Sequence, residues 1–273
     1  MKINLSIVLY NSPLEDINNI IKSLELVKTK FTLYVIDNSP TDELEENFKI
    51  NDNIVYIHNP ENPGFGASHN IAIKRSIEEK SKYHFVINPD VFFDEDAITN
   101  LVNYMQNHDE IGMIMPKILN INGSTQFLPK LLPSPYSILM RKVKFPSFLY
   151  NTFINKYELR KVDENLIYEA PVLSGCFTLF RTDALREVGL YDERYFMYFE
   201  DWDLSRRMHA KFKTVYYPKV CVYHGYDSGA NKSKRLFKIY LNSAFSYFTK
   251  WGWFFDKERK RINKKTLKQF TFS

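Results

Sequence analysis

Short apolar runs alternate with helix-like segments through the first 119 residues. The runs INLSIVLY, FTLYVID, NIVYIHN, YHFVIN and IGMIMPKIL are predicted strands, and SPTDELEENF and DEDAITNLVNYMQNH are among the predicted helices between them. Strands separated by helices of this length are typical of an α/β fold with a mostly parallel sheet covered on both faces. Ligands of such sheets bind at the carboxyl ends of the strands, so the polar residues that follow each strand are candidate site residues.

Local signals predict where several helices begin and end. In NSPLEDI, Ser12 is the expected N-cap, Pro13 the first helical residue and Glu15 the partner in a capping box. Thr182 is the expected N-cap of a short helix in TDALREVG, and Gly189 is expected to end that helix.

The alternation breaks between residues 125 and 165. Residues 127–161 hold four prolines, seven basic residues and one acidic residue, so we expect an insertion or mobile cover. Regular patterning resumes over 166–231. Residues 232–273 form a basic aromatic segment, with twelve Lys or Arg against two acidic residues, whereas the whole chain has a net charge of +5.

Composition and motifs exclude several classes of protein. GxxxxGK is absent, and GFGASH lacks the third glycine of a dinucleotide fingerprint, so an ATPase or NAD enzyme is disfavoured. Two cysteines are too few for a disulfide framework, so we expect the protein to function in a reducing compartment. We find no signal peptide and expect no transmembrane span.

Two strand ends carry carboxylates suited to binding a ligand. Asp90, in INPDV, is placed to hold magnesium or manganese together with diphosphate oxygens, because these cations prefer oxygen ligands. A turn-forming role for Asp90 is equally open. Asp37, in DNSPTD, is placed to accept hydrogen bonds from a base or ribose. Gly64 and Gly66, before the next helix, permit close backbone approach to an anion.

The stretch YFMYFEDWDLSRR places Glu200, Asp201 and Asp203 within an aromatic run. Carboxylates at a helix N-terminus are stabilised by its dipole, and Arg206 or Arg207 is spaced to pair with them one turn later. This accounts for one or two of the acids. Aromatic neighbours desolvate a carboxylate and raise its pKa, which makes it a better general base at neutral pH.

The last predicted strand ends at His224, which is a candidate metal ligand or phosphate donor, although a structural role is as plausible. Lys232, in the loop that follows, is placed to neutralise a leaving group. For the basic aromatic segment we favour attachment to an anionic membrane surface over docking on the core. Nucleic-acid binding by this segment remains an alternative, as does a nucleotidyltransferase, but we expect no nucleic-acid partner because the predicted cleft is acidic.

Taken in order, SIVLYN, DNSPTD, NPGFGASHN, FVINPDV, SGCFTLFRTDALREVGLYDERYFMYFEDWDLSRR and HGYDSG resemble the inverting family 2 glycosyltransferases of GT-A fold, in particular their bacterial rhamnosyltransferase-like branch. The resemblance runs from about residue 3 to 229. It implies that residues 1–124 are a nucleotide-sugar-binding half and residues 166–231 an acceptor and catalytic half.

The resemblance also implies roles for individual residues. Asp201 is the expected catalytic base, with Glu200 assisting, and Asp90 and His224 are the expected metal ligands for magnesium or manganese. The expected donor-binding residues are Tyr10, Asn11, Asp37, Asn38, Gly64, Gly66, Asn70, Asn88 and Lys232. The expected acceptor-binding residues are Gly175, Tyr198 and Trp202.

The expected donor follows from the same resemblance, whereas the expected membrane location follows from the basic aromatic segments 130–161 and 232–273. The first choice of donor is dTDP-rhamnose, and the expected acceptor is a hydroxyl of a growing surface polysaccharide carried on a membrane lipid. We expect a cytoplasmic protein that associates peripherally with the inner face of the membrane.

Overall fold

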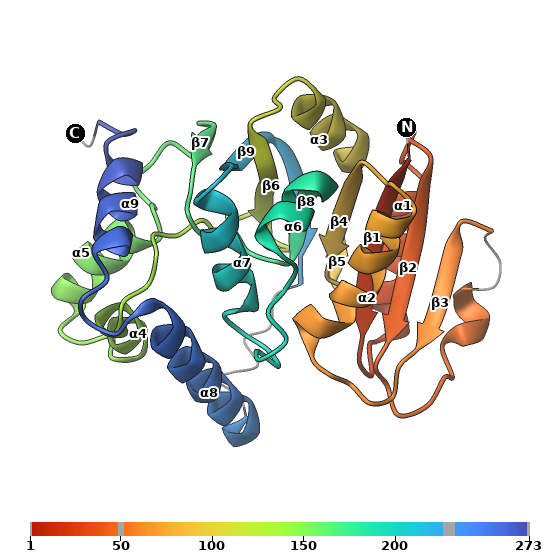
Figure 1. The fold of residues 1–273 in the computed structure, drawn as a ribbon, viewed down its shortest axis with the longest axis horizontal. Helices are drawn as coiled ribbons and strands as arrows, with labels where there is room; N and C mark the ends of the chain where they lie inside the picture. Colours follow the sequence, from red (N-terminus) through yellow and green to blue (C-terminus); the bar gives the residue numbers. More distant parts are fainter. Residues whose placement is uncertain (1, 49–51, 226–232, 272–273) are drawn as a thin grey trace.

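The computed structural model describes residues 2–48, 52–225 and 233–271. Nine strands form one sheet (Figure 1), with the order β3-β2-β1-β4-β8-β6-β9-β5 and with β7 paired to β9. The strands are β1 (Ile3–Leu9), β2 (Phe31–Asp37), β3 (Ile54–His58), β4 (Tyr83–Ile87), β5 (Val91–Phe92), β6 (Ile111–Leu119), β7 (Tyr168–Glu169), β8 (Phe177–Arg181) and β9 (Lys213–His224).

The sheet is parallel in its first half and mixed in its second. β3, β2, β1 and β4 are parallel neighbours, whereas β8 runs antiparallel to both β4 and β6. β6 and β9 are parallel, and the short strands β5 and β7 run antiparallel to β9. The predicted α/β class is therefore confirmed, with antiparallel strands added where the chain returns through the centre of the sheet.

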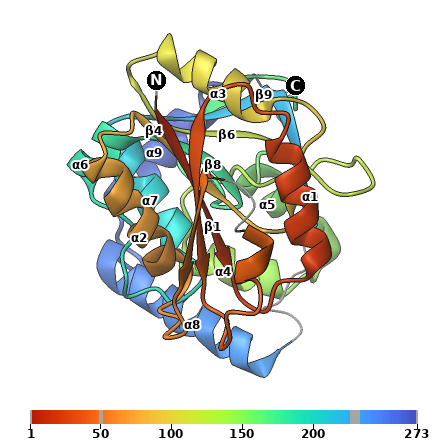
Figure 2. The same ribbon diagram turned by 90° about the vertical axis from the view of Figure 1, so that its right-hand side faces the viewer.

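Helices cover both faces of the sheet. Figure 2 shows α1 (Leu14–Leu24) on one face and α2 (Phe65–Glu78), α6 (Thr182–Val188) and α7 (Glu200–His209) on the other. α3 (Ala97–Gln106) packs against β6 and β9. Because helices cover both faces, a central strand such as β1 is buried almost throughout, which explains its continuous apolar run.

Three local predictions were wrong. Helix α1 begins at Leu14 with Pro13 in the N-cap position and no side-chain cap; Ser12 Oγ instead accepts from the Tyr10 N–H at 3.3 Å. The segment SPTDELEENF forms only the single 3₁₀ turn η1 (Glu45–Phe48). It buries Phe48 and Ser39 but leaves most of its other polar residues exposed, so it has no apolar face to support a longer helix. The predicted cap of α6 was wrong as well, since Thr182 is its first residue and Arg181 takes the N-cap position without a side-chain cap. Gly189 ends α6 with a positive φ of 84°, as predicted.

Two helical additions lie beside the sheet. Residues 125–165 contain α4 (Pro135–Lys142) and α5 (Ser147–Tyr157), which pack on one another. The C-terminal segment contains α8 (Lys234–Trp251) and α9 (Lys257–Leu267), at the blue end of Figure 1. Tyr247 and Phe248 of α8 pack in an aromatic cluster with Phe199, and Ile262 of α9 packs with Leu132 and Val172. Much of the tail is thus docked on the core.

A buried ion pair fastens the turn between α8 and α9 to α7. Arg206 Nη1 and Nη2 donate to the Asp256 carboxylate, at 2.7 and 2.9 Å, and the guanidinium lies 4.1 Å from the centre of the Trp251 ring. Asp256 also caps α9 by accepting from the Arg259 N–H. Both side chains of the pair are almost fully buried, so neither charge can turn to water if the other is removed.

We predict that Asp256→Ala lowers the free energy of unfolding by about 3–5 kcal/mol, because it leaves Arg206 buried without its anion. Glu258→Ala is the matched control, since Glu258 is 45% exposed and contacts Arg206 only at 3.4 Å; we expect a loss of about 1 kcal/mol or less. Urea unfolding curves measure both. Equal losses in the two variants would contradict this account.

Candidate active site

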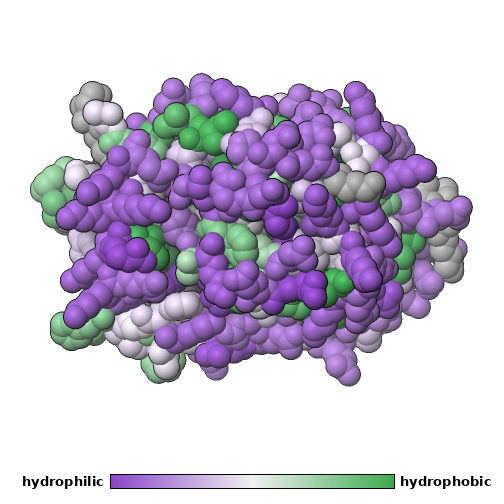
Figure 3. All heavy atoms as spheres, turned by 45° about the horizontal axis from the view of Figure 1, so that its top comes forward, coloured by the Kyte–Doolittle hydropathy of each residue, from purple (hydrophilic) through white to green (hydrophobic). Residues whose placement is uncertain are grey.

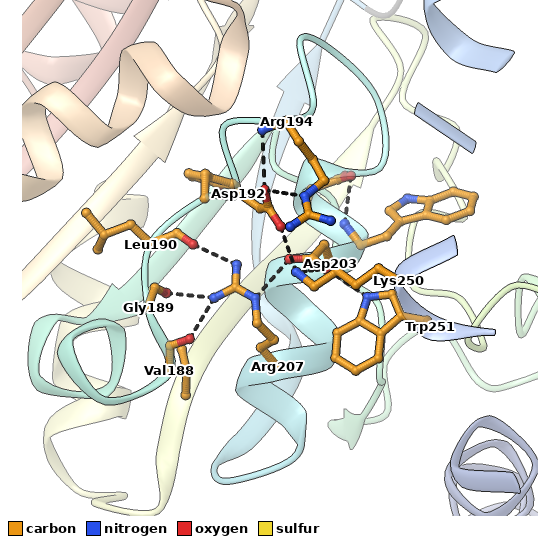
Figure 4. A network of polar contacts seen from close by, with 12 residues as sticks. Val188, Gly189, Leu190, Asp192, Arg194, Asp203, Arg207, Lys250 and Trp251 are labelled. Atoms are coloured by element: carbon orange, nitrogen blue, oxygen red, sulfur yellow. Dashed lines mark hydrogen bonds and ion pairs between the residues drawn. The ribbon is translucent and has the colours of Figure 1, made fainter. Parts of the chain in front are cut away.

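The N-terminus of α7 is held by a polar network around Asp203 (Figure 4). Asp203 is fully buried and accepts from Arg207 Nε at 2.8 Å, Trp251 Nε1 at 2.7 Å and Lys250 Nζ at 2.7 Å. Arg207 donates its remaining N–H groups to the carbonyls of residues 188–190. The network therefore joins α7, the loop after α6 and the end of α8. The predicted pairing of an α7 acid with an arginine one turn later is confirmed for Asp203 and Arg207.

Glu200 and Asp201 instead border a cavity of about 710 Å³. Tyr198 and Phe199 precede them with φ near 70°, a conformation that is uncommon for residues other than glycine and that turns the chain sharply into the helix. Trp202 follows on the cavity wall, and residues of the 125–165 segment form the opposite wall.

The two carboxylates are desolvated and interact. Burial raises the pKa of Asp201 to about 6, against the lowering effects of the Gly175 N–H and of the Lys130 charge. Burial, and then repulsion from Asp201, raise the pKa of Glu200 well above its usual range. Glu200 Oε2 has no hydrogen-bond partner in the described part of the chain. The pair therefore takes up protons at a much higher pH than exposed acids do.

Asp201 is held by backbone groups. Its Oδ2 accepts from the Gly175 N–H at 3.2 Å and its Oδ1 from the Trp202 N–H at 2.9 Å. A Cβ at Gly175 would lie 3.4 Å from the Asp201 Cβ and 3.3 Å from the Phe65 ring. Glycine at 175 thus lets the backbone approach the carboxylate. Tyr198 and Trp202, two further predicted acceptor-binding residues, line the cavity, and Gly175 adjoins it through Asp201.

Lys130 is a cavity residue that the sequence did not single out. Its side chain is buried, and Nζ donates to the carbonyls of Phe127 and Leu128. Burial lowers the pKa of Lys130 to about 8, partly offset by the charges of Glu158 and Asp201. It brings a positive charge toward the carboxylate pair.

Asp90 and His224 come together across the sheet edge, with Asp90 Oδ2 3.4 Å from His224 Nε2. Asn88 Nδ2 lies 3.3 Å from the same nitrogen, and Asn88 Oδ1 is buried without a hydrogen-bond partner among the described residues. Carboxylate, amide oxygen and imidazole are ligand types that Mn²⁺ accepts. Within the described ranges, no group of three or more His, Cys, Asp or Glu side chains is arranged to hold a metal. The trio nevertheless fits a divalent cation, because it leaves a buried oxygen unused.

Gln126, which the sequence analysis also did not single out, connects Asp90, His224 and Asn88 to the cavity. Its Oε1 lies 3.1 Å from His224 Nδ1, and its Nε2 donates to the His224 carbonyl at 2.9 Å. Gln126 lines the same cavity as Asp201. The two predicted sites, metal-binding and catalytic, are therefore neighbours.

The other predicted donor-binding residues lie at the carboxyl ends of β1 and β2. Asp37 is buried and accepts from Tyr56 Oη at 2.6 Å and the Ser39 N–H at 2.9 Å. Asn38 is buried and bonded to Ser68 and Asn59. Tyr10 and Asn11 are exposed at the same edge, where the Asn11 N–H donates to Ser39 Oγ.

The glycine loop lies against protein rather than against open space. Gly64 has a φ of 101°, and a Cβ there would collide with the Phe196 carbonyl; one at Gly66 would collide with Tyr191. The Asn70 amide is buried and bonded to both backbone groups of Tyr191. These three residues therefore position the loop that leads into Glu200. Lys232 lies outside the described residues.

The fold is that of the GT-A glycosyltransferases. The chain superposes with a TM-score of 0.63 on the crystal structure of GalNAc-T7 with UDP, GalNAc and Mn²⁺, at 16% sequence identity, over 89% of this chain and 47% of that one. Residues 5–189 match the family described as glycosyl transferase family 2. The chain belongs to that family, although the match ends before the Glu200–Asp201 pair.

Two relatives have named activities. The N-acetylglucosaminyl-diphospho-decaprenol L-rhamnosyltransferase of Mycobacterium tuberculosis is 34% identical over 51% of this chain and 45% of its own length. The low-salt glycan biosynthesis hexosyltransferase Agl10 of Haloferax volcanii is 27% identical over 75% of this chain and 61% of its own length. The chain thus spans about half of these two relatives.

We predict that Glu200→Gln stabilises the protein increasingly as pH rises above about 4.5. In the wild type the folded state keeps a proton on Glu200 that the unfolded chain releases, because the folded pKa is the higher. Stability should therefore fall with pH, by at most about 1.4 kcal/mol per unit, until the folded pKa is passed. Urea unfolding of both proteins between pH 5 and 8 measures the difference. Asp183→Asn, at a carboxylate that is 82% exposed, should show no such trend, and parallel curves for wild type and Glu200→Gln would refute the prediction.

Proposed function

We propose that the protein is an inverting glycosyltransferase that moves a sugar from a nucleotide-sugar donor to an acceptor hydroxyl. The observation that carries this proposal is the desolvated Glu200–Asp201 pair, which borders a cavity next to the Asp90–His224 pair. Family membership supports the reaction class.

Asp201 is the general base of the proposed reaction. Its raised pKa gives the carboxylate a stronger affinity for the hydroxyl proton of the acceptor. The Gly175 and Trp202 N–H groups fix the carboxylate. The pKa of Glu200 is raised well above its usual range by burial, so Glu200 keeps its proton to a higher pH than an exposed glutamate and limits the negative charge around Asp201. The deprotonated hydroxyl attacks the anomeric carbon on the face opposite the leaving nucleoside diphosphate, so the configuration inverts in one displacement.

Asp90, His224 and Asn88 are the residues that would hold magnesium or manganese with the donor diphosphate. A cation bound there would offset the charge that develops on the leaving diphosphate. The buried Asn88 oxygen supports this assignment. Asp37 and Asn38, with Tyr10 and Asn11 at the same sheet edge, would contact the nucleoside.

We further propose a lipid-linked glycan as acceptor. The name of the mycobacterial relative supports both a rhamnosyl donor and a lipid diphosphate acceptor, whereas that of the haloarchaeal relative gives only a hexosyl group. dTDP-rhamnose remains our first choice of donor. No helix within the described residues is long and apolar enough to cross a membrane. Peripheral attachment at the inner face of the membrane is the proposed location.

We predict that Asp201→Asn lowers kcat/KM by about two or more orders of magnitude, because the amide cannot accept the proton. Donor affinity, measured by calorimetry, should stay within about twofold. In the wild type, kcat/KM should rise with pH through about 6, the pKa of the carboxylate. Glu187→Gln changes an exposed carboxylate and serves as the control. Wild-type turnover by Asp201→Asn would remove Asp201 from this role.

We predict that Asp90→Ala weakens Mn²⁺-dependent binding of UDP or dTDP by at least about tenfold, a typical loss at a metal site. Calorimetry with and without EDTA measures the affinity for the nucleotide, and the electron paramagnetic resonance signal of Mn²⁺ measures the concentration of unbound metal. Asp94→Ala, at an exposed acid just after β5, should behave as wild type. Full transfer activity in excess chelator would contradict metal dependence.

A further inference from the structure

Three cations lie at the rim of the cavity, apart from the proposed catalytic groups. Arg141 and Lys142 are the last two residues of α4, Lys144 follows shortly after, and all three line the cavity that also contains Asp201. Among the lining residues, α7 contributes the acids Glu200 and Asp201, and the end of α4 and the turn after it contribute these three cations. Glu158, a further acid of the lining, lies 3.7 Å from Arg141 and offsets part of its charge. The two groups of charges suit an acceptor that presents a hydroxyl at one end and an anion at the other.

Aromatic rings hold two of these cations in place. The Arg141 guanidinium lies 5.7 Å from the centre of the Trp202 ring, and Lys142 Nζ lies 5.0 Å from that of Tyr240 and 5.2 Å from that of Phe237. Partial burial, and then repulsion from Arg141 and Lys144, lower the pKa of Lys142. A bound anion would relieve this repulsion.

Exposed apolar side chains surround the same rim. Val143, Phe145, Phe148 and Leu149 are 48%, 81%, 67% and 48% exposed. Lys142 also contacts the Phe237 ring of α8, and Leu241 of the same helix is 47% exposed. The face drawn in Figure 3 is largely hydrophilic, with small and separate apolar patches. A concentration of exposed apolar residues marks an interaction surface, and cations beside it suit anionic lipid headgroups.

Resting on the proposed function, we propose that Arg141, Lys142 and Lys144 bind the phosphate of a lipid-linked acceptor while residues 143–149 contact the apolar layer that carries the lipid. Lysine binds phosphate as a point charge and arginine through its planar fork. The phosphate at the rim would leave the attached sugar in the cavity, with a hydroxyl directed toward Asp201.

The donor diphosphate is a rival source of the same anion. We assign the donor diphosphate to the Asp90–His224 pair at the ends of the strands. The rim cations have exposed apolar side chains beside them, which would not stabilise a polar nucleotide. The lipid-linked phosphate is therefore the better match, and the two sources make different predictions for a variant of the rim.

The test measures binding of farnesyl diphosphate, a short lipid diphosphate, to the full chain by calorimetry below its micellar concentration. Lys142→Gln/Lys144→Gln should weaken this binding by about tenfold or more, since two charge-assisted contacts are lost. Lys156→Gln/Lys161→Gln removes the same charge from exposed positions of the same segment that do not line the cavity, and should bind as wild type. Phe148→Ser/Leu149→Ser should weaken binding of farnesyl diphosphate but not of inorganic diphosphate.

Mn²⁺-dependent binding of UDP or dTDP, measured on the same variants, separates the two proposals. We expect it to be unchanged when the rim is altered. If the rim variant loses nucleotide binding instead, the cations belong to the donor site and the inference is overturned. The inference is also overturned if the wild type and Lys142→Gln/Lys144→Gln bind farnesyl diphosphate with equal affinity. Failure of the wild type to bind any nucleotide with Mn²⁺ would count against the proposed function. The rim site is tested separately, by the binding of farnesyl diphosphate.

Discussion

The buried Asp203 carboxylate is the contact on which the geometry of the site depends. It collects donors from Arg207 on its own helix and from Lys250 and Trp251 on α8, while Arg207 ties the loop after α6. Removing one charged partner of such a group leaves an uncompensated buried charge and lowers the free energy of unfolding by several kcal/mol. The first turn of α7 is therefore rigid, and a carboxylate that must meet a hydroxyl within a few tenths of an ångström requires this rigidity.

Helical geometry explains why neighbouring acids have different environments. Successive residues of an α-helix are rotated by about 100°, so Asp201 and Asp203 project on nearly opposite sides of α7. Asp203 faces the cations of α8, whereas Asp201 faces the cavity, where backbone N–H groups fix it without neutralising it. Glu200 also lines the cavity, and one of its oxygens has no hydrogen-bond partner among the described residues. The crowding of carboxylates in one stretch thus reflects a structural anchor and a reactive pair within one turn of helix.

The sequence predicted the parts of the fold that depend on local periodicity. Strands β1 to β4 and β6 and the start of α7 were recognisable because their apolar patterns are short and regular. The antiparallel insertion of β8 was not, since pairing direction is set by contacts distant in sequence. Asp90 and His224 were found from their strand-end positions, although they are far apart in the chain. Lys130 and Gln126 were missed because they lie in an irregular, proline-containing segment with no period to place them.

The C-terminal helices pack against α7 and the cavity that Glu200 and Asp201 border. Tyr240 lines the cavity, Lys250 and Trp251 hold Asp203, and Asp256 neutralises Arg206. The aromatic residues of this segment are divided, with Tyr247 and Phe248 in the core and Phe254 and Phe255 exposed. Deleting residues 245–273 would therefore disturb the catalytic helix along with any membrane contact. Single changes at exposed aromatics separate the two effects, because they leave the buried ion pairs of α7 intact.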